Sequence, residues 1–416
     1  MSQLSRIPAR AETAPELSNH TEITGALDSL YRWMKAREFA GYEPFDLMNS
    51  PYCAGGWARR FPFSVLLRHL GRRLVGLKTR EFLRVPASKN CKALGLILGG
   101  CCDMGRLDEG WRSEADHIKN ELRRLRSPNE EFFCWGYDWD AISIRANVMA
   151  KFSPNSVATV FCGDALLDMA LVYGDQEARE MAESVGRFII GRLNRPVDTD
   201  SEVCFSYTPT DQTQIYNSSA LSGAFLARLG NLTSKQEYVA LARRAMQYLV
   251  NEQRNDGSWF YGARKVQRWI DGFHTGYNLD ALCGYRENSG DHSFDAAITK
   301  GYSYYEKTFF RKDGGPTYFH NRDYPIDIHS CSQAIITFCT FARIEDSLSR
   351  AVAAAEWTLK TMRAPEGYFY YQQHRLWTNH TPYMRWGQAW MFKALARLLR
   401  TISESSGDFP VPTPTS

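Results

Sequence analysis

Two segments of the chain place an aspartate shortly before a histidine at the start of a predicted helix. In RWIDGFHTGYNLDAL the pair is Asp271 and His274, and in RDYPIDIHSCSQAI it is Asp327 and His329. A helix N-terminus stabilises a carboxylate and helps to keep a nearby imidazole neutral, as a proton acceptor requires. Both aspartates also suit the simpler role of helix N-caps. The histidines are therefore candidate proton-transfer residues, and the aspartates are candidates for catalysis or for capping.

Aromatic and polar side chains gather in the segments that precede several predicted helices. Flat aromatic rings pack against the C–H faces of sugar rings, and neighbouring polar groups select hydroxyls. Packing between helices is the alternative role for some of these rings. The predicted sugar-binding residues are Trp135, Tyr137, Asp138, Asn217, Trp259, Tyr261, Trp269, Tyr318, His320, Tyr324, Tyr371 and Trp386.

The aromatic segments recur along the chain at a regular interval. Tyr207, Tyr261, Tyr318 and Tyr370 mark four of them, separated by 54, 57 and 52 residues. Each segment follows a helix with one apolar stripe, as over residues 178–189, and precedes a less charged helix. A period of about 55 residues therefore indicates a repeated helical hairpin.

The repeat predicts an all-α (α/α)6 toroid of about six helical hairpins, with short aromatic β-like segments at one mouth. The less charged helices are expected to form the inner ring, because their small and apolar residues suit helices surrounded by others. We predict a single toroid domain over residues 21–402 and flexible ends over 1–20 and 403–416. An open solenoid and a two-domain helical protein are the alternatives.

Composition excludes several classes of partner. The 50 basic and 46 acidic side chains give a net charge of +4, which provides no electrostatic footprint for nucleic acid or an anionic membrane. The sequence shows no signal peptide and no apolar run long enough to span a bilayer, so we expect no transmembrane segment and a cytoplasmic location. The ten cysteines are expected to be buried thiols, and we expect no metal and no cofactor.

The motifs SWFYG, WIDGFHTGYNLDAL, YPIDIHSCSQAI and YMRWGQAWMFKALARL resemble those of bacterial exopolysaccharide- and capsule-biosynthesis proteins with an (α/α)6 toroid. This resemblance covers about residues 130–400. More distantly, GGW (55–57), SYTP (206–209) and FHTGYN (273–278) are similar to the catalytic domain of D-glucuronyl C5-epimerases, whose additional β-domain has no counterpart here. The resemblance implies a carbohydrate-active enzyme of polysaccharide biosynthesis, with an oligo- or polysaccharide substrate and association with a polysaccharide assembly complex.

Three functions are compatible with these residues. In the first, C5 of a uronic acid residue loses its proton, and epimerisation or elimination follows. His274 would shuttle protons with Tyr207 or Tyr277, while Arg385 or His329 would neutralise the substrate carboxylate. In the second, Asp271 and Asp327 would be the acid and base of a glycoside hydrolase. In the third, the cleft binds a glycan or a lipid-linked intermediate without catalysis.

Overall fold

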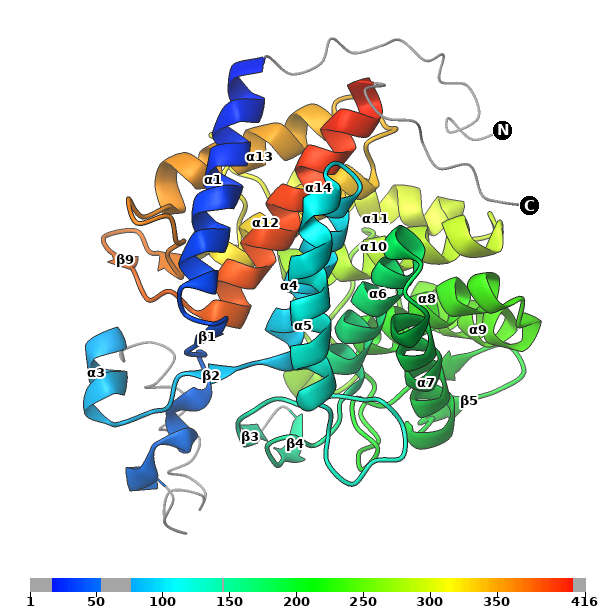
Figure 1. The fold of residues 1–416 in the computed structure, drawn as a ribbon. Helices are drawn as coiled ribbons and strands as arrows, with labels where there is room; N and C mark the ends of the chain where they lie inside the picture. The colour runs from blue at the N-terminus through cyan, green and yellow to red at the C-terminus, as the bar shows by residue number, and fades with distance from the viewer. Residues whose placement is uncertain (1–16, 54–75, 144–145, 407–416) are drawn as a thin grey trace.

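Twelve long helices alternate between an inner and an outer layer in the computed structural model, which describes residues 17–53, 76–143 and 146–406 (Figure 1). The inner helices are α4 (Cys91–Gly105), α6 (Ser156–Tyr173), α8 (Tyr216–Thr233), α10 (Gly272–Ser289), α12 (Ile328–Thr340) and α14 (Ala389–Ser406). The outer helices are α1 (Leu17–Lys35), α5 (Arg112–Arg124), α7 (Gln176–Arg192), α9 (Gln236–Asn251), α11 (Asp295–Thr308) and α13 (Ser347–Met362).

The inner helices form a closed ring. Each packs against the next along the chain, and α14 returns to pack against α4. Each outer helix packs on an inner helix, and α1 packs on α14, so the sixth hairpin joins the first and last helices (Figure 1). The predicted (α/α)6 toroid is therefore confirmed. The open-solenoid and two-domain alternatives are wrong, because the ring has no free end.

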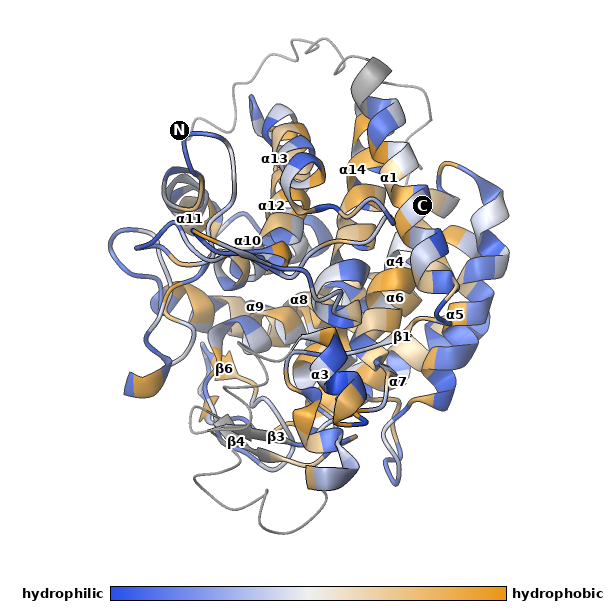
Figure 2. Cartoon of the chain, turned by 90° about the vertical axis from the view of Figure 1, so that its left-hand side faces the viewer, coloured by the Kyte–Doolittle hydropathy of each residue, from blue (hydrophilic) through white to orange (hydrophobic). Residues whose placement is uncertain are grey.

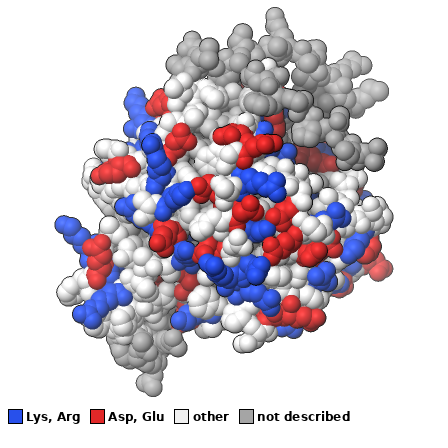
Figure 3. All heavy atoms as spheres, viewed as in Figure 1, with Lys and Arg blue, Asp and Glu red and all other residues white. Residues whose placement is uncertain are grey.

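Burial explains which helices line the ring. All fifteen residues of α4 are buried, whereas α5 buries a stripe that includes Ala115, Ile118 and Leu122 and leaves its charged face in solvent. Figure 2 shows the same contrast, with apolar colour on α4 and α6 and polar colour over much of α5. Basic and acidic side chains are interspersed on the described face seen in Figure 3.

Polar caps fix the start of four inner helices. The side chains of Asn90, Asn155, Asp271 and Asp327 each accept a hydrogen bond from a backbone N–H in the first turn of α4, α6, α10 and α12, respectively. Such caps satisfy backbone donors that the helix leaves unpaired. Long segments enter the inner helices at these ends, whereas turns as short as Gly174–Asp175 lead from inner to outer helices. The long segments therefore share one end of the ring, which we call the mouth.

Short elements connect the helices around the mouth. The antiparallel strand pairs are β1 (Ala40–Gly41) with β2 (Ser88–Lys89), β3 (Ala141–Ser143) with β4 (Ala146–Met149), and β5 (Val197–Asp198) with β6 (Val203–Cys204). A three-stranded sheet contains β7 (Ile326–Asp327), β8 (Gln372–Gln373) and β9 (Thr378–Asn379), with Asp327 opposite Gln372. The short helices are α3 (Leu77–Phe82), η2 (Asp46–Asn49), η3 (Pro51–Cys53), η4 (Glu109–Trp111), η5 (Lys265–Gln267) and the π-turn η6 (Met384–Gln388).

The ends of the helical region differ slightly from the prediction. Helix α1 begins at Leu17 and α14 ends at Ser406, so helix extends four residues beyond each predicted boundary. The rest of the predicted flexible ends, and the GGW motif at 55–57, lie outside the described residues. All ten cysteines are buried and free, which confirms their prediction as thiols.

One described helix, α6, is long and apolar enough to cross a membrane by length and composition. In the structure 61% of that helix is buried, because it packs between α4 and α8 within the ring. Its apolar character therefore fits a position in the core. The described residues contain no group of three or more His, Cys, Asp or Glu arranged to hold a metal ion.

Close packing of the inner ring depends on small residues. A Cβ added at Gly95 of α4 would lie 3.0 Å from the carbonyl oxygen of Phe161 and 3.1 Å from Cα of Cys162, both in the backbone of α6. A backbone neighbour has little freedom to move, so a side chain at this position would force the two helices apart.

We therefore expect Gly95→Val to lower the free energy of unfolding by about 1–3 kcal/mol, measured by urea titration. The matched control is Gly25→Val on the outer helix α1, where a Cβ meets nothing within 4 Å. That control is expected to change stability by only a few tenths of a kcal/mol, since valine and glycine have similarly low helix propensities. Equal effects of the two substitutions would contradict the packing argument.

Candidate active site

The first turns of the inner helices bring side chains from distant parts of the sequence to the mouth. His274 is the third residue of α10, while His329, Asn217 and Lys92 are the second residues of α12, α8 and α4. Trp386 comes from η6, directly before α14. The ring therefore brings residues from the starts of several inner helices, rather than one contiguous motif, to the mouth.

Asp271 holds His274 in a defined orientation. Its Oδ2 lies 2.7 Å from Nδ1 of His274, and its Oδ1 accepts the backbone N–H of the same residue at 2.9 Å. Because a carboxylate only accepts hydrogen bonds, this contact places a proton on Nδ1, which in a neutral imidazole leaves the lone pair on Nε2. Nε2 makes no hydrogen bond within the described part of the chain, and the side chain is 19% exposed. The arrangement suits a proton acceptor.

An aromatic wall lies beside this pair. Trp269 donates its indole N–H to Asp271 at 2.8 Å, and the ring of Tyr261 stacks on Trp269 with centroids 4.3 Å apart. The ring of Tyr261 also lies 4.5 Å from that of His274. Tyr261 and Trp269 are only partly buried, so they offer ring surface next to the imidazole.

A second histidine lies deeper in the mouth. Nε2 of His329 is 2.7 Å from the hydroxyl of Tyr277, and its ring stacks on Phe273 at 4.4 Å. Phe273 also contacts His274, with centroids 4.0 Å apart. Burial holds the pKa of His329 well below its usual value, and the nearby Lys92 and Arg385 lower it further. A neutral His329 is unsuited to the predicted role of neutralising a carboxylate.

Asp327 is bound on both oxygens by protein donors. Oδ1 accepts the backbone N–H of His329 at 2.9 Å and the indole N–H of Trp386 at 2.8 Å. Oδ2 accepts the amide of Gln372 at 2.6 Å. Asp327 is fully buried, and it acts as a cap that also orients Trp386. The ring of Trp386 meets that of His329 edge-on, with centroids 4.9 Å apart.

Arg385 contributes a buried positive charge with its own acidic partner. Its guanidinium lies 2.7 Å from Glu43 and 5.3 Å and 5.0 Å from the ring centroids of Tyr137 and Trp139. Burial raises the pKa of the Glu43 carboxyl to about 8, against the opposing influence of Arg385. The hydroxyl of Tyr137 is 3.4 Å from that of Tyr207. Arg385 and both tyrosines are therefore linked at one side of the mouth.

Two predicted sugar-binding tryptophans lie in the wall between hairpins instead. Trp135 is 0% exposed and donates its indole N–H to the carbonyl of Leu122, and Trp259 is 2% exposed and donates to that of Leu249. Each tryptophan thus fastens a segment to the end of the preceding outer helix. The structure does not bring these two residues to the mouth, because each indole is buried against the preceding outer helix.

Other predicted binding residues take structural positions. Asp138 accepts the side-chain amide of Asn90 at 2.7 Å and so secures the cap of α4. Tyr371 is buried, and its carbonyl accepts the backbone N–H of Ile328 at 3.1 Å.

Three more predicted binding residues lie around Phe273 and the segments that lead to α12. Tyr318 packs on Phe273 at 5.5 Å, His320 is exposed with Nδ1 3.2 Å from the carbonyl of Ile270, and Arg311 lies over the ring of Tyr324 at 5.0 Å. Tyr318 therefore supports the floor of the mouth, whereas the other two belong to its rim.

Lys92 was not among the site residues predicted from the sequence. It occupies the second position of a helix whose fifteen residues are all buried, and its ammonium lies 4.1 Å from the ring centroid of Phe161. The signal was available, because Lys92 is the only basic residue in CKALGLILGGCCDMG. It went unnoticed because the surrounding segment lacks the aromatic residues that marked the other repeats.

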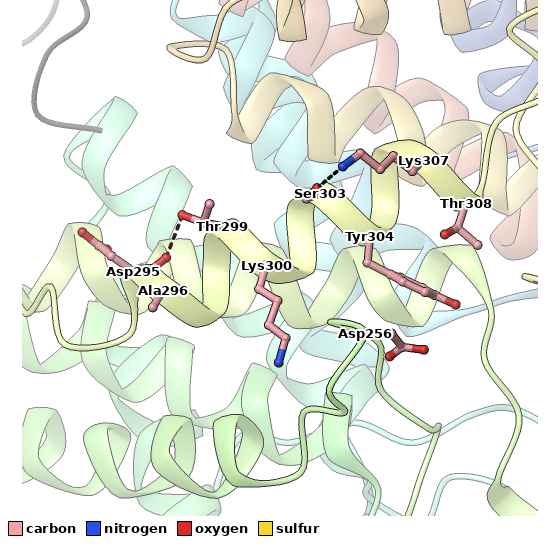
Figure 4. Close-up of a pocket in the computed structure, with 9 residues that line it drawn as sticks. All are labelled: Asp256, Asp295, Ala296, Thr299, Lys300, Ser303, Tyr304, Lys307 and Thr308. Carbon is pink, nitrogen blue, oxygen red and sulfur yellow. Dashed lines mark hydrogen bonds between the residues drawn. The ribbon is translucent and has the colours of Figure 1, made fainter. Parts of the chain in front are cut away.

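A separate hollow lies on the outer layer. Figure 4 shows it along α11, lined by side chains that include Lys300, Tyr304 and Lys307, with Asp256 below. It contains none of the histidines or stacked rings of the mouth, and it faces outward from an outer helix. We therefore place the candidate active site at the mouth.

Comparison with known proteins identifies the fold. No protein-family model and no curated protein sequence matches the chain. Among solved structures, it is similar to a glycoside hydrolase family 76 mannosidase from Bacteroides thetaiotaomicron (TM-score 0.61, 11% identity, covering 94% of this chain and 100% of that one).

It is also similar to cellobiose 2-epimerase from Bacillus thermoamylovorans (TM-score 0.59, 13% identity, covering 77% and 90%). A third similar structure is a D-mannose isomerase (TM-score 0.60, 10% identity, covering 76% and 87%). At these identities the likeness shows the α/α toroid fold.

The buried histidine predicts a specific dependence of stability on pH. An unfolded chain protonates this residue as the pH falls through about 6.5, whereas folded His329 stays neutral because its pKa is depressed. The unfolded state then binds more protons, so His329 lowers stability below that pH. We expect the free energy of unfolding of His329→Gln to decline less between pH 7 and pH 5.5, by about 1 kcal/mol, in urea titrations. Parallel curves for the two proteins would contradict this.

Proposed function

We propose that the chain is a carbohydrate-active enzyme that moves a proton at a sugar carbon, with His274 as the base. The Asp271–His274 pair carries this proposal. A buried carboxylate fixes Nδ1, Nε2 has no partner within the described residues, and the rings of Tyr261 and Trp269 lie beside it. Histidine suits proton transfer near neutral pH, and aromatic rings suit the apolar faces of a sugar.

The finer proposal is that the proton comes from C5 of a uronic acid residue in a polysaccharide. His274 would remove it, and the electrons of the C–H bond would move toward the adjacent carboxylate as an enolate. Return of a proton to the other face gives epimerisation, and loss of the group at C4 gives elimination. Burial keeps the pKa of Tyr277 well above its usual value, so this residue retains its proton for donation. The resemblance to exopolysaccharide-biosynthesis proteins supports a polymer under assembly.

Glycoside hydrolysis is the second candidate, favoured by the similarity in fold to family 76 mannosidases. The carboxylates predicted for it are less suited to the task. Each oxygen of Asp271 and of Asp327 already accepts a hydrogen bond from a protein donor. A catalytic acid must carry a proton and reach the glycosidic oxygen, and these two residues instead act as helix caps.

The test is proton exchange with solvent. In D2O the wild-type protein is expected to place deuterium at C5 of an intact glucuronate-containing oligosaccharide, detected by NMR. We expect His274→Gln to lower this exchange about 100- to 10,000-fold, because a positioned base contributes rate enhancement of that size. Asp271→Asn keeps a cap but loses the charge that orients the ring, so it should also lower the rate.

The chain contains a matched control for these variants. His292 and Asp295 form another histidine–aspartate pair, 2.9 Å apart at the start of α11, with the His292 side chain 70% exposed. His292→Gln should leave exchange unchanged. New reducing ends without exchange would support the hydrolase, and retained glycan binding with neither reaction would support a binding protein.

A further inference from the structure

Lys92 lies among four inner helices. Its ammonium is 4.1 Å from the ring centroid of Phe161 on α6, 5.1 Å from that of Trp390 on α14 and 5.5 Å from that of Tyr277 on α10. The residue is 3% exposed. Side chains from four inner helices therefore meet at this lysine, at the floor of the mouth.

The ammonium has no acidic partner. In residues 17–53, 76–143 and 146–406 it makes no hydrogen bond or ion pair, and its close contacts are with aromatic rings. The carboxylates of the mouth have other donors: Glu43 pairs with Arg385, and Asp271 pairs with His274. Asp327 is likewise occupied. The amine is thus available to bind a group that the described chain itself does not supply.

Lys92 is poorly explained as a stabilising residue. Burial of a cation without a carboxylate is unfavourable, and the start of a helix adds further repulsion because its dipole end is positive. Burial, followed by Arg385, holds the pKa of Lys92 well below its usual value. An apolar residue would suit this position in α4 better. Residues that are unfavourable for folding and lie in a cleft are candidates for function.

The neighbourhood is suited to an anion. Helices α4, α8, α10 and α12 all begin at the mouth, and helix N-termini favour negative charge. Lys92 and His274 both flank Tyr277: the ammonium lies 5.5 Å from its ring centroid and the imidazole 5.8 Å. The base and the ammonium therefore both border one side chain at the mouth.

We propose that Lys92 binds the carboxylate of an anionic sugar at the floor of the mouth. This inference rests on the proposed function and names the substrate class of the same site. When His274 accepts the C5 proton, the electron pair of the C–H bond enters the C5–C6 bond and the carboxylate gains a second negative charge. The ammonium of Lys92 stabilises that charge. The additional charge is lost when a proton returns to C5. Lys92 thus takes the role that sequence analysis gave to Arg385 or His329.

The experiment compares two ligands that differ only at C6. Methyl glucuronoside carries a carboxylate there and methyl glucoside a hydroxymethyl group. Calorimetry of wild-type protein should show tighter binding of the glucuronoside. Lys92→Met should weaken glucuronoside binding at least tenfold and change glucoside binding less than twofold. Lys92→Arg, which keeps the charge, should retain part of the preference.

Stability separates a lost site from a misfolded chain. We expect Lys92→Met to melt at the same temperature as the wild type or higher, because it removes an unpaired buried charge. Lys119→Met is the matched control, since Lys119, on the outer helix α5, is also largely buried but pairs with Asp175 at 2.7 Å. It should leave glucuronoside binding unchanged.

The outcomes distinguish this inference from the proposed function. Unchanged glucuronoside binding in Lys92→Met, an equal loss for both ligands, or no preference in the wild type would overturn the anion site. If Lys92→Met abolishes the preference while no exchange occurs at C5, the anion site stands and the proton-transfer reaction is wrong. If exchange occurs and depends on His274 but not on Lys92, only the present inference is wrong.

Discussion

Asp103, near the end of α4, forms ion pairs with Lys393, Arg397 and Arg400 of α14. Nζ of Lys393 lies 2.7 Å from Oδ2 and Arg400 lies 2.9 Å from Oδ1. Burial opposes ionisation of Asp103, yet these cations hold the pKa of its carboxyl below the usual range. Gly99 and Gly100 let α14 approach closely, because a Cβ at either would lie within 3 Å of Lys393 or Phe392. This contact between α4 and α14 closes the ring of inner helices, and the mouth depends on that closure.

Two aspartates at the mouth each serve two purposes. Asp271 begins α10 and also orients His274, and Asp327 begins α12 and also orients Trp386. Each oxygen of both carboxylates already accepts a hydrogen bond from the protein, so neither is well placed to exchange protons itself. In the proposed function, His274 and Lys92 therefore carry the chemistry of the mouth. This division between positioning and reacting groups follows from where helices begin.

Much of the fold could be predicted from the sequence, because a repeat of about 55 residues is visible in helix periodicity and aromatic spacing alone. The Asp271–His274 pair could be predicted too, since capping and chemistry both favour that spacing. The orientation of each aromatic ring could not. Trp135 and Trp259 occupy similar places in their repeats, as binding residues would, but each indole instead fastens its segment to the preceding outer helix. Lys92 was missed because its partners come from three other helices, 69 to 298 residues away along the chain.

The pairing of the N-terminal and C-terminal helical segments affects how the chain folds during translation. Contacts such as Arg363 with Ser29 and Arg385 with Glu43 join residues 334 and 342 positions apart. Such distant contacts form slowly, because the intervening chain must first be ordered. During translation the early hairpins can stack on one another, but the gap beside α4 stays open until α14 leaves the ribosome. A nascent chain therefore exposes the faces of α1 and α4 that contact α14 until α14 is made, and the candidate site is assembled only then.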